Sequence, residues 1–99
     1  MLAVDQKNLI IRLNQRLADF AGKDISDCPG LAIDELLPLG SAQLKAICAK
    51  VFKSGVAVLN QEISFTKNKQ NIFWTVNAYP VNYDPASSLT VSLIINDIS

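Results

Sequence analysis

The end of the chain carries two long runs of β-branched and aromatic residues. One run covers residues 73–81 and the other covers residues 89–99, and the polar segment 82–88 separates them. Runs of this kind, joined by a segment that contains Asn, Asp, Pro and Ser, are typical of an antiparallel hairpin. The pattern predicts two long strands that close the domain.

Short apolar runs and polar turns also alternate at the start of the chain. The apolar runs 2–5 and 9–13 flank the polar residues 6–8, which predicts a second hairpin. Asn14 is a good helix N-cap, and Gly22 can adopt the left-handed conformation that ends a helix. A two-turn helix is therefore expected between these two residues.

The middle of the chain has helical periodicity. Residues 31–37 predict a short helix that Pro38 stops, and Ser41 opens a longer helix that ends before Gly55. Apolar residues of the longer helix recur at the i, i+3, i+4, i+7 spacing of one helical face. These residues are Leu44, Ile47, Cys48 and Val51.

A third strand is predicted over residues 56–66, followed by a turn over residues 67–71. Strict alternation places its side chains on two faces. The face expected toward the core carries Ala57, Leu59, Gln61, Ile63 and Phe65, and the outer face carries Val58, Asn60, Glu62 and Ser64.

Composition and charge limit the function classes. Ninety-nine residues with 49% hydrophobic content predict one globular domain over residues 1–99. Nine basic and nine acidic residues cancel, so the sequence offers no basic surface for nucleic acid or for an anionic membrane. No leader pattern and no membrane-length apolar run is present, so a cytoplasmic module is expected, with Cys28 and Cys48 as reduced thiols.

The order of the predicted elements and three short motifs resemble the PAS domains, small sensory modules of signalling proteins. The motifs are Trp74 and the segment 79–81 (Tyr-Pro-Val) in the penultimate strand, and the segment 97–99 (Asp-Ile-Ser) after the last strand. The resemblance covers nearly the whole chain. It implies an α+β fold in which short helices and one longer helix pack on one face of a five-stranded antiparallel sheet.

Two further positions match the PAS pattern, and one departs from it. Asn14 stands where the first helix of the family often begins, and Gly22 stands where it often ends. The segment 87–88 (Ser-Ser) replaces a turn that commonly contains glycine. The departure alters a loop and leaves the predicted fold unchanged.

The resemblance implies a sensory or regulatory function within a larger signalling protein. Such a protein would be a sensor histidine kinase of a two-component system, or a diguanylate cyclase, with the output domain covalently attached. The domain would bind a small molecule in an apolar pocket, form a homodimer, or do both. The alternative is a ligand-free PAS domain that acts only in dimerisation or protein interaction.

The strand alternation and the resemblance together identify the side chains that would line a pocket. The candidate ligand-binding residues are Leu44, Ile47, Cys48, Val51, Gln61, Trp74, Val76, Leu93 and Ile95. The same apolar positions equally describe an ordinary core. Gln61 needs a polar partner, which a backbone group, a water or a ligand could supply. Trp74 would either fill the pocket or stack on a planar cofactor.

The cofactor is open, but two PAS chemistries are disfavoured. The chain has no histidine, which excludes histidine-ligated haem. Cysteinyl-flavin photochemistry requires a reactive cysteine in a short helix, where Ile33 stands in this sequence. The lack of histidine also removes the usual general base, and the cysteines have no metal-ligand spacing, so we expect neither an enzyme nor a metal site. A small enzyme of a different α+β family is the remote alternative.

The last two strands predict a coupling residue and a dimer interface. The resemblance implies that Asp97 couples the last strand to the output domain. The alternative interpretation is that Asp97 is simply an exposed acidic residue at the end of a strand. Apolar side chains of the outer sheet face predict a homodimer centred on Phe73, Tyr79 and Ile94. The alternative is a monomer with an exposed apolar face.

Overall fold

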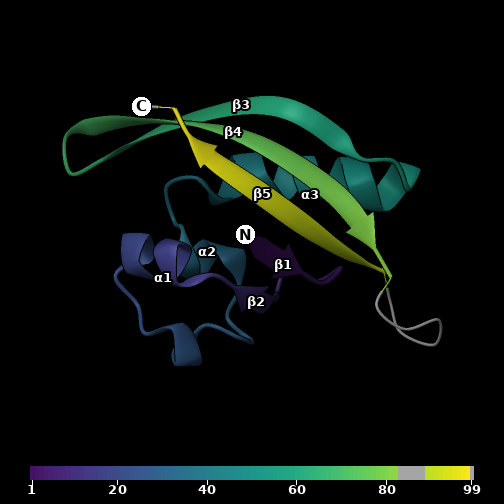
Figure 1. Ribbon diagram of the computed structural model, residues 1–99, viewed down its shortest axis with the longest axis horizontal. Helices are drawn as coiled ribbons and strands as arrows, with labels where there is room; N and C mark the ends of the chain where they lie inside the picture. Colours follow the sequence, from purple (N-terminus) through teal and green to yellow (C-terminus); the bar gives the residue numbers. More distant parts are fainter. Residues whose placement is uncertain (83–88, 99) are drawn as a thin grey trace.

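The computed structural model describes residues 1–82 and 89–98 (Figure 1). Strands and helices follow one another in the predicted order. They are β1 (Leu2–Val4), β2 (Ile10–Leu13), α1 (Gln15–Ala21), the 3-10 helix η1 (Ile25–Asp27), α2 (Ile33–Leu36), α3 (Ser41–Ser54), β3 (Val58–Lys67), β4 (Gln70–Val81) and β5 (Thr90–Asp97).

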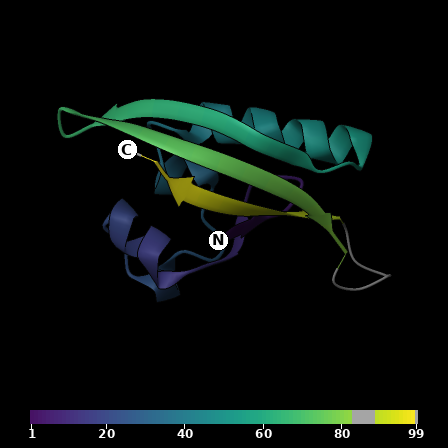
Figure 2. The ribbon, with the colours of Figure 1, turned by 45° about the horizontal axis from the view of Figure 1, so that its top comes forward.

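The five strands form one antiparallel sheet in the order β2-β1-β5-β4-β3. The first strand therefore pairs with the last, with Ala3 opposite Ser92. Helix α3 contacts β3, β4 and β5, and Figures 1 and 2 show it lying along one side of these strands. The predicted α+β architecture is confirmed.

Local signals set both ends of α1 and the end of α3 as the sequence predicts, whereas α2 is shorter than the predicted helix over residues 31–37. The backbone N–H of Leu17 donates to Oδ1 of Asn14 at 3.2 Å, which caps α1. Gly22 and Gly55, each with a φ of 71°, end α1 and α3 in the left-handed region that glycine adopts without strain. In the described part of the chain, no helix is both long and apolar enough to span a bilayer.

The hydrophobic core lies between α3 and the inner face of the sheet. Residues from α3, from β1 and from the last two strands are fully enclosed in it. They include Leu2, Val4, Leu44, Cys48, Val51, Val76, Ala78, Val91 and Leu93. Side chains that stand one turn apart on α3, or two residues apart on a strand, thus share one buried layer.

Strand β3 differs from the predicted strict alternation. Val58 pairs with Ala78 and Gln61 pairs with Val76, so two residues of β3 oppose only Asn77 of β4. This β-bulge turns Leu59 outward, where it is 51% exposed, and turns Val58 toward the core. The predicted inward Leu59 and outward Val58 are therefore wrong.

The bulge has an identifiable cause. Asn60 adopts a φ of 55°, a left-handed conformation that asparagine tolerates better than most residues. Its backbone N–H donates to Oδ1 of Asn77 at 2.8 Å, so a side chain replaces the strand partner that the bulge removes. The alternation of residues along β3 alone cannot predict this hydrogen bond, because the bond joins two strands.

Candidate functional site

The predicted pocket residues do come together, but most of them fill the core. Seven of them are buried in one contiguous cluster, Ile95 packs against it, and Gln61 is half-buried beside Val76. The buried seven are Leu44, Ile47, Cys48, Val51, Trp74, Val76 and Leu93. Their role in ligand binding stays a prediction.

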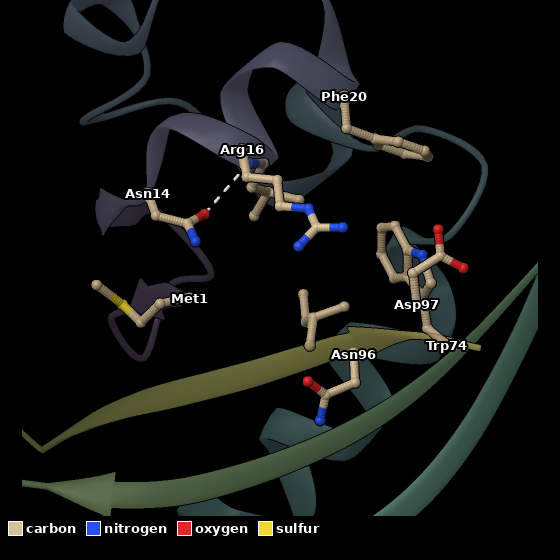
Figure 3. Close-up of a pocket in the computed structure, with 9 residues that line it drawn as sticks. Met1, Asn14, Arg16, Phe20, Trp74, Asn96 and Asp97 are labelled. Atoms are coloured by element: carbon tan, nitrogen blue, oxygen red, sulfur yellow. Dashed lines mark hydrogen bonds between the residues drawn. The ribbon is translucent and has the colours of Figure 1, made fainter. Parts of the chain in front are cut away.

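A half-open cavity of about 210 Å³ lies beside this core, between α1 and the end of β5 (Figure 3). Two of the predicted pocket residues, Trp74 and Ile95, form part of its wall. The other lining residues are Met1, Asn14, Arg16, Leu17, Phe20, Asn96 and Asp97. The cavity therefore lies closer to α1 than the sequence predicts.

Trp74 faces the core as predicted, and it anchors an aromatic cluster. It is only 3% exposed, and its ring centroid lies 5.1 Å from that of Phe20 and 5.0 Å from that of Phe65. The Phe65 ring meets the Trp74 ring edge to face at 88°, a favourable arrangement for aromatic pairs. Trp74 thus fills space toward the core and presents a wall to the cavity.

Phe20 separates this cavity from a second one of about 130 Å³. The second cavity lies toward α2 and is also lined by Leu37, Phe65 and Lys67. The ammonium group of Lys67 donates to the carbonyl of Phe20 and lies 4.0 Å from the centroid of its ring. These contacts hold Phe20 from both its backbone and its ring.

Polar groups gather at the open side of the larger cavity. Asp97 stands directly opposite Trp74 in the β4–β5 pairing, so both side chains project from the helical face of the sheet. Arg16 reaches into the cavity from α1, as Figure 3 shows. Burial lowers the pKa of the Met1 amino group, which lies at the same site.

Sequence reasoning did not identify Arg16 and Phe20 as site residues. The sequence could have indicated Phe20, because it lies on the apolar face of the predicted first helix. It could not have indicated Arg16, since an arginine in the first turn of a short helix is ordinarily a solvated surface residue. Only the packing of α1 against the end of β5 makes it part of the cavity.

Both cysteines are buried and free, which confirms the predicted reduced thiols. The thiol of Cys28 donates to the carbonyl of Asp24 at 3.3 Å. Desolvation raises the pKa of the Cys48 thiol to about 12, which keeps it protonated and unreactive. In the ranges 1–82 and 89–98, no three His, Cys, Asp or Glu side chains gather in a possible metal site.

Solved structures share this arrangement of strands and helices over the whole chain. The PAS domain of a protein from Colwellia psychrerythraea superposes with a TM-score of 0.67, covering 98% of this chain and 85% of that one at 13% identity. The chain has the PAS fold. The predicted resemblance is thereby confirmed in three dimensions.

Two further solved structures are similar as well. A domain of an HTR-like protein from Haloarcula marismortui has a TM-score of 0.75 and 16% identity, covering 99% of this chain and 95% of that one. A sensory box sensor histidine kinase from Vibrio cholerae has a TM-score of 0.69 and 18% identity, covering 99% of this chain and 80% of that one. No protein-family profile matches the sequence, and no curated protein does. At such low sequence identity, the similarity establishes the PAS fold alone. A fold by itself does not define a ligand or a partner.

Proposed function

We propose that the chain, residues 1–99, is a single cytoplasmic, non-catalytic sensory PAS domain of a larger signalling protein. A small molecule binds at the cavity beside Trp74, and the change is passed through β5 to an attached output domain. The observation that carries this proposal is the position of the cavity: its wall includes Asp97, at the end of the last strand.

The cavity joins recognition to output because one strand serves both. Ile95 forms part of the cavity wall, and Asp97 lies two residues further along the same face of β5. A ligand that contacts both residues would bias the position of the strand end relative to α1. Such coupling requires two positions of the strand end that differ in ligand affinity. The ligand can shift the equilibrium between these positions only by as much as the two affinities differ.

Filling the cavity tests this function. In the full-length protein, Ile95→Trp should occupy the cavity and abolish regulation of the output by the ligand. The control Ile11→Trp adds the same bulk to an exposed position of β2 that does not line the cavity. Output that remains regulated in Ile95→Trp, as it does in the control, would contradict the proposal.

Asp97 has a separate test as the coupling residue. Asp97→Ala should uncouple ligand binding from output while the domain stays folded, because the residue is exposed at the end of β5. Native mass spectrometry and an absorption spectrum of the domain purified from cells would report any retained ligand before and after the change. Unchanged regulation would remove Asp97 from the mechanism.

The outer face of the sheet favours a second candidate function, homodimerisation without a ligand. Phe73, Tyr79 and Ile94 are 46%, 41% and 40% exposed. They lie on one face of two neighbouring strands, and exposed apolar side chains on a sheet face can mark an interface. Sedimentation at micromolar concentration tests this function: a dimer that Ile94→Glu dissociates is expected, and a monomer at every concentration excludes it.

A further inference from the structure

The two edges of the sheet are covered in different ways. At the β2 edge, main-chain groups of a neighbouring segment pair with the strand: the N–H of Ile10 donates to the carbonyl of Leu31 at 2.8 Å, and the N–H of Gly30 donates to the carbonyl of Ile10 at 2.8 Å. At the β3 edge, no main-chain segment of the described ranges 1–82 and 89–98 takes this position. Strand β3 therefore offers an edge to which another strand can add.

One side chain from α3 occupies this edge of β3. The side-chain amide of Gln43 donates to the carbonyl of Ser64 at 2.7 Å, and its Oε1 accepts from the N–H of Ser64 at 3.4 Å. A neighbouring antiparallel strand would bond to the same two groups, because the residues of a hydrogen-bonded pair exchange both of their N–H···O bonds. The Gln43 side chain thus takes the place of a strand at the middle of β3.

The bonds at Ser64 also define which other backbone groups of β3 point outward. Hydrogen bonding alternates along an antiparallel strand, so Glu62 and Thr66 direct their N–H and C=O groups away from β4, as Ser64 does. Both residues are exposed. Gln43 therefore covers the central one of three outward-facing positions.

Two further features limit pairing at the ends of β3. The bulge at Asn60 interrupts the regular strand at one end, and Lys67 directs its ammonium group toward Phe20 of α1 at the other end. Bulges and lysines are features by which natural sheets discourage pairing at an edge. The stretch between them, residues 61–66, keeps a regular register with β4, and Gln43 bonds to its outer edge.

From these observations we infer that β3 is a latent strand-pairing surface for a second copy of this chain, and that Gln43 closes it. The second copy adds its own β3, antiparallel and centred on Ser64, when the Gln43 side chains leave the edge. This surface is distinct from the cavity of the proposed function and from the outer face that carries Phe73 and Ile94. A negative result here would leave both of those proposals unaffected.

Self-complementarity favours a second copy over an unrelated extended segment. Pairing about Ser64 places Ile63 opposite Phe65 on the helical face and Glu62 opposite Thr66 on the outer face. Over residues 61–67 this register sets no acid opposite an acid and no base opposite a base, an arrangement that would be destabilising. The strand therefore matches itself in both pattern and charge.

Removing the Gln43 amide tests the inference by sedimentation over a range of concentrations. Every protein compared carries Ile94→Glu, so that association through the outer sheet face does not contribute. Gln43→Ala should raise the self-association constant at least about tenfold, because two hydrogen bonds that compete with pairing are lost. Gln43→Met keeps the length of the side chain without its amide and should behave in the same way.

The control Gln6→Ala makes the same change at an exposed position of the β1–β2 turn and should leave association unchanged. Circular dichroism verifies that each variant is folded. A monomer at every concentration in the Gln43→Ala protein, or in Gln43→Met where Gln43→Ala does not fold, would overturn the inference.

Amide hydrogen exchange measured by NMR identifies the edge and the register. In Gln43→Ala at low concentration, the Ser64 N–H should exchange faster than in the parent, because it has lost its acceptor. At high concentration the N–H groups of Glu62, Ser64 and Thr66 should become protected together, whereas those that face β4 are protected throughout. An association that leaves these three amides unprotected would place the interface elsewhere and contradict pairing through β3.

Changes at Ser64 test the centre of the pairing in the Gln43→Ala background. Ser64→Pro removes an N–H that points away from β4, so proline suits the edge strand but blocks a further strand, and the monomer should return. Ser64→Lys should also restore the monomer, because it sets two like charges opposite each other. The control Ser64→Val keeps the N–H and adds no charge, so its dimer should persist. A dimer that persists in all three variants would exclude pairing about Ser64.

Discussion

The part of the sheet under α3 and the part beside α1 are filled in different ways. Under α3, the side chains of Leu44, Val51 and Leu93 are fully enclosed and lie in one buried layer. Beside α1, the side chain of Ile95 is only half-buried and borders the larger cavity. Leu93 and Ile95 are two residues apart on the same face of the same strand, so a short step along β5 separates core from site.

Helix length accounts for this difference. Helix α3 spans residues 41–54 and covers β3, β4 and β5, whereas α1 spans only residues 15–21. A seven-residue helix presents about two turns, which cannot cover the end of a long strand. The aromatic cluster of Phe20, Phe65 and Trp74 fills part of the remaining space, and Phe20 and Trp74 border the larger cavity.

The largest effect is expected at Trp74, which belongs to both regions. Trp74→Ala should lower the free energy of unfolding by about 3 to 5 kcal/mol, because it removes a buried aromatic side chain. It should also enlarge the cavity so that it admits small apolar molecules. Denaturant unfolding and xenon or benzene binding measure the two results. A near-neutral change in stability with no added binding would break the assignment of Trp74 to the core.

A matched pair on β5 measures the contrast itself. Leu93→Ala should cost about 2 to 5 kcal/mol of unfolding free energy, as a deletion in a closely packed core does. Ile95→Ala should cost clearly less, about 1 to 2 kcal/mol, since its side chain already borders open space. Denaturant midpoints of the two variants, at equal slope, give the difference. Equal losses would show that the two regions are packed alike.

Thiol labelling compares access to the two regions. Cys48 lies in the core under α3, and burial raises the pKa of its thiol to about 12, so it should resist alkylation in the native state at neutral pH. A cysteine placed at the cavity by Ile95→Cys should be alkylated much faster. Mass spectrometry of native and denatured samples counts the labelled thiols. Rapid native labelling at Cys48 would mean that the core opens as readily as the cavity.

The smallest effect is expected at the surface contact between α2 and α3. Hydrogen bonds from Ser41 and Lys45 lower the pKa of the exposed Asp34 carboxyl. Its contribution to stability is therefore present above the ordinary value of 3.8 and is lost as the pH falls through the lowered pKa. An NMR titration should show the Asp34 pKa moving back toward its ordinary value in Ser41→Ala. A larger return in the control variant Lys45→Met would reverse the order of the two causes.

Much of this protein could be predicted from local sequence. Asn14 and Gly22 bound the first helix, and Gly55 ends the last, because caps act on backbone groups within a few residues of themselves. The inward position of Trp74 follows from alternation along β4, which has no bulge between Trp74 and Ala78. These short-range rules also define the strand and helix order that underlies the PAS resemblance.

The remaining features depend on contacts between distant segments, which no local pattern encodes. The bulge at Asn60 requires the side chain of Asn77, and a single extra residue is enough to reverse the faces of Val58 and Leu59. The site likewise forms only because β5 is a central strand of the sheet and its end meets α1. That packing brings Arg16 and Asp97, which lie at opposite ends of the sequence, to one cavity. The sequence thus determined the elements and their order, and the tertiary structure decided where their packing leaves a cavity.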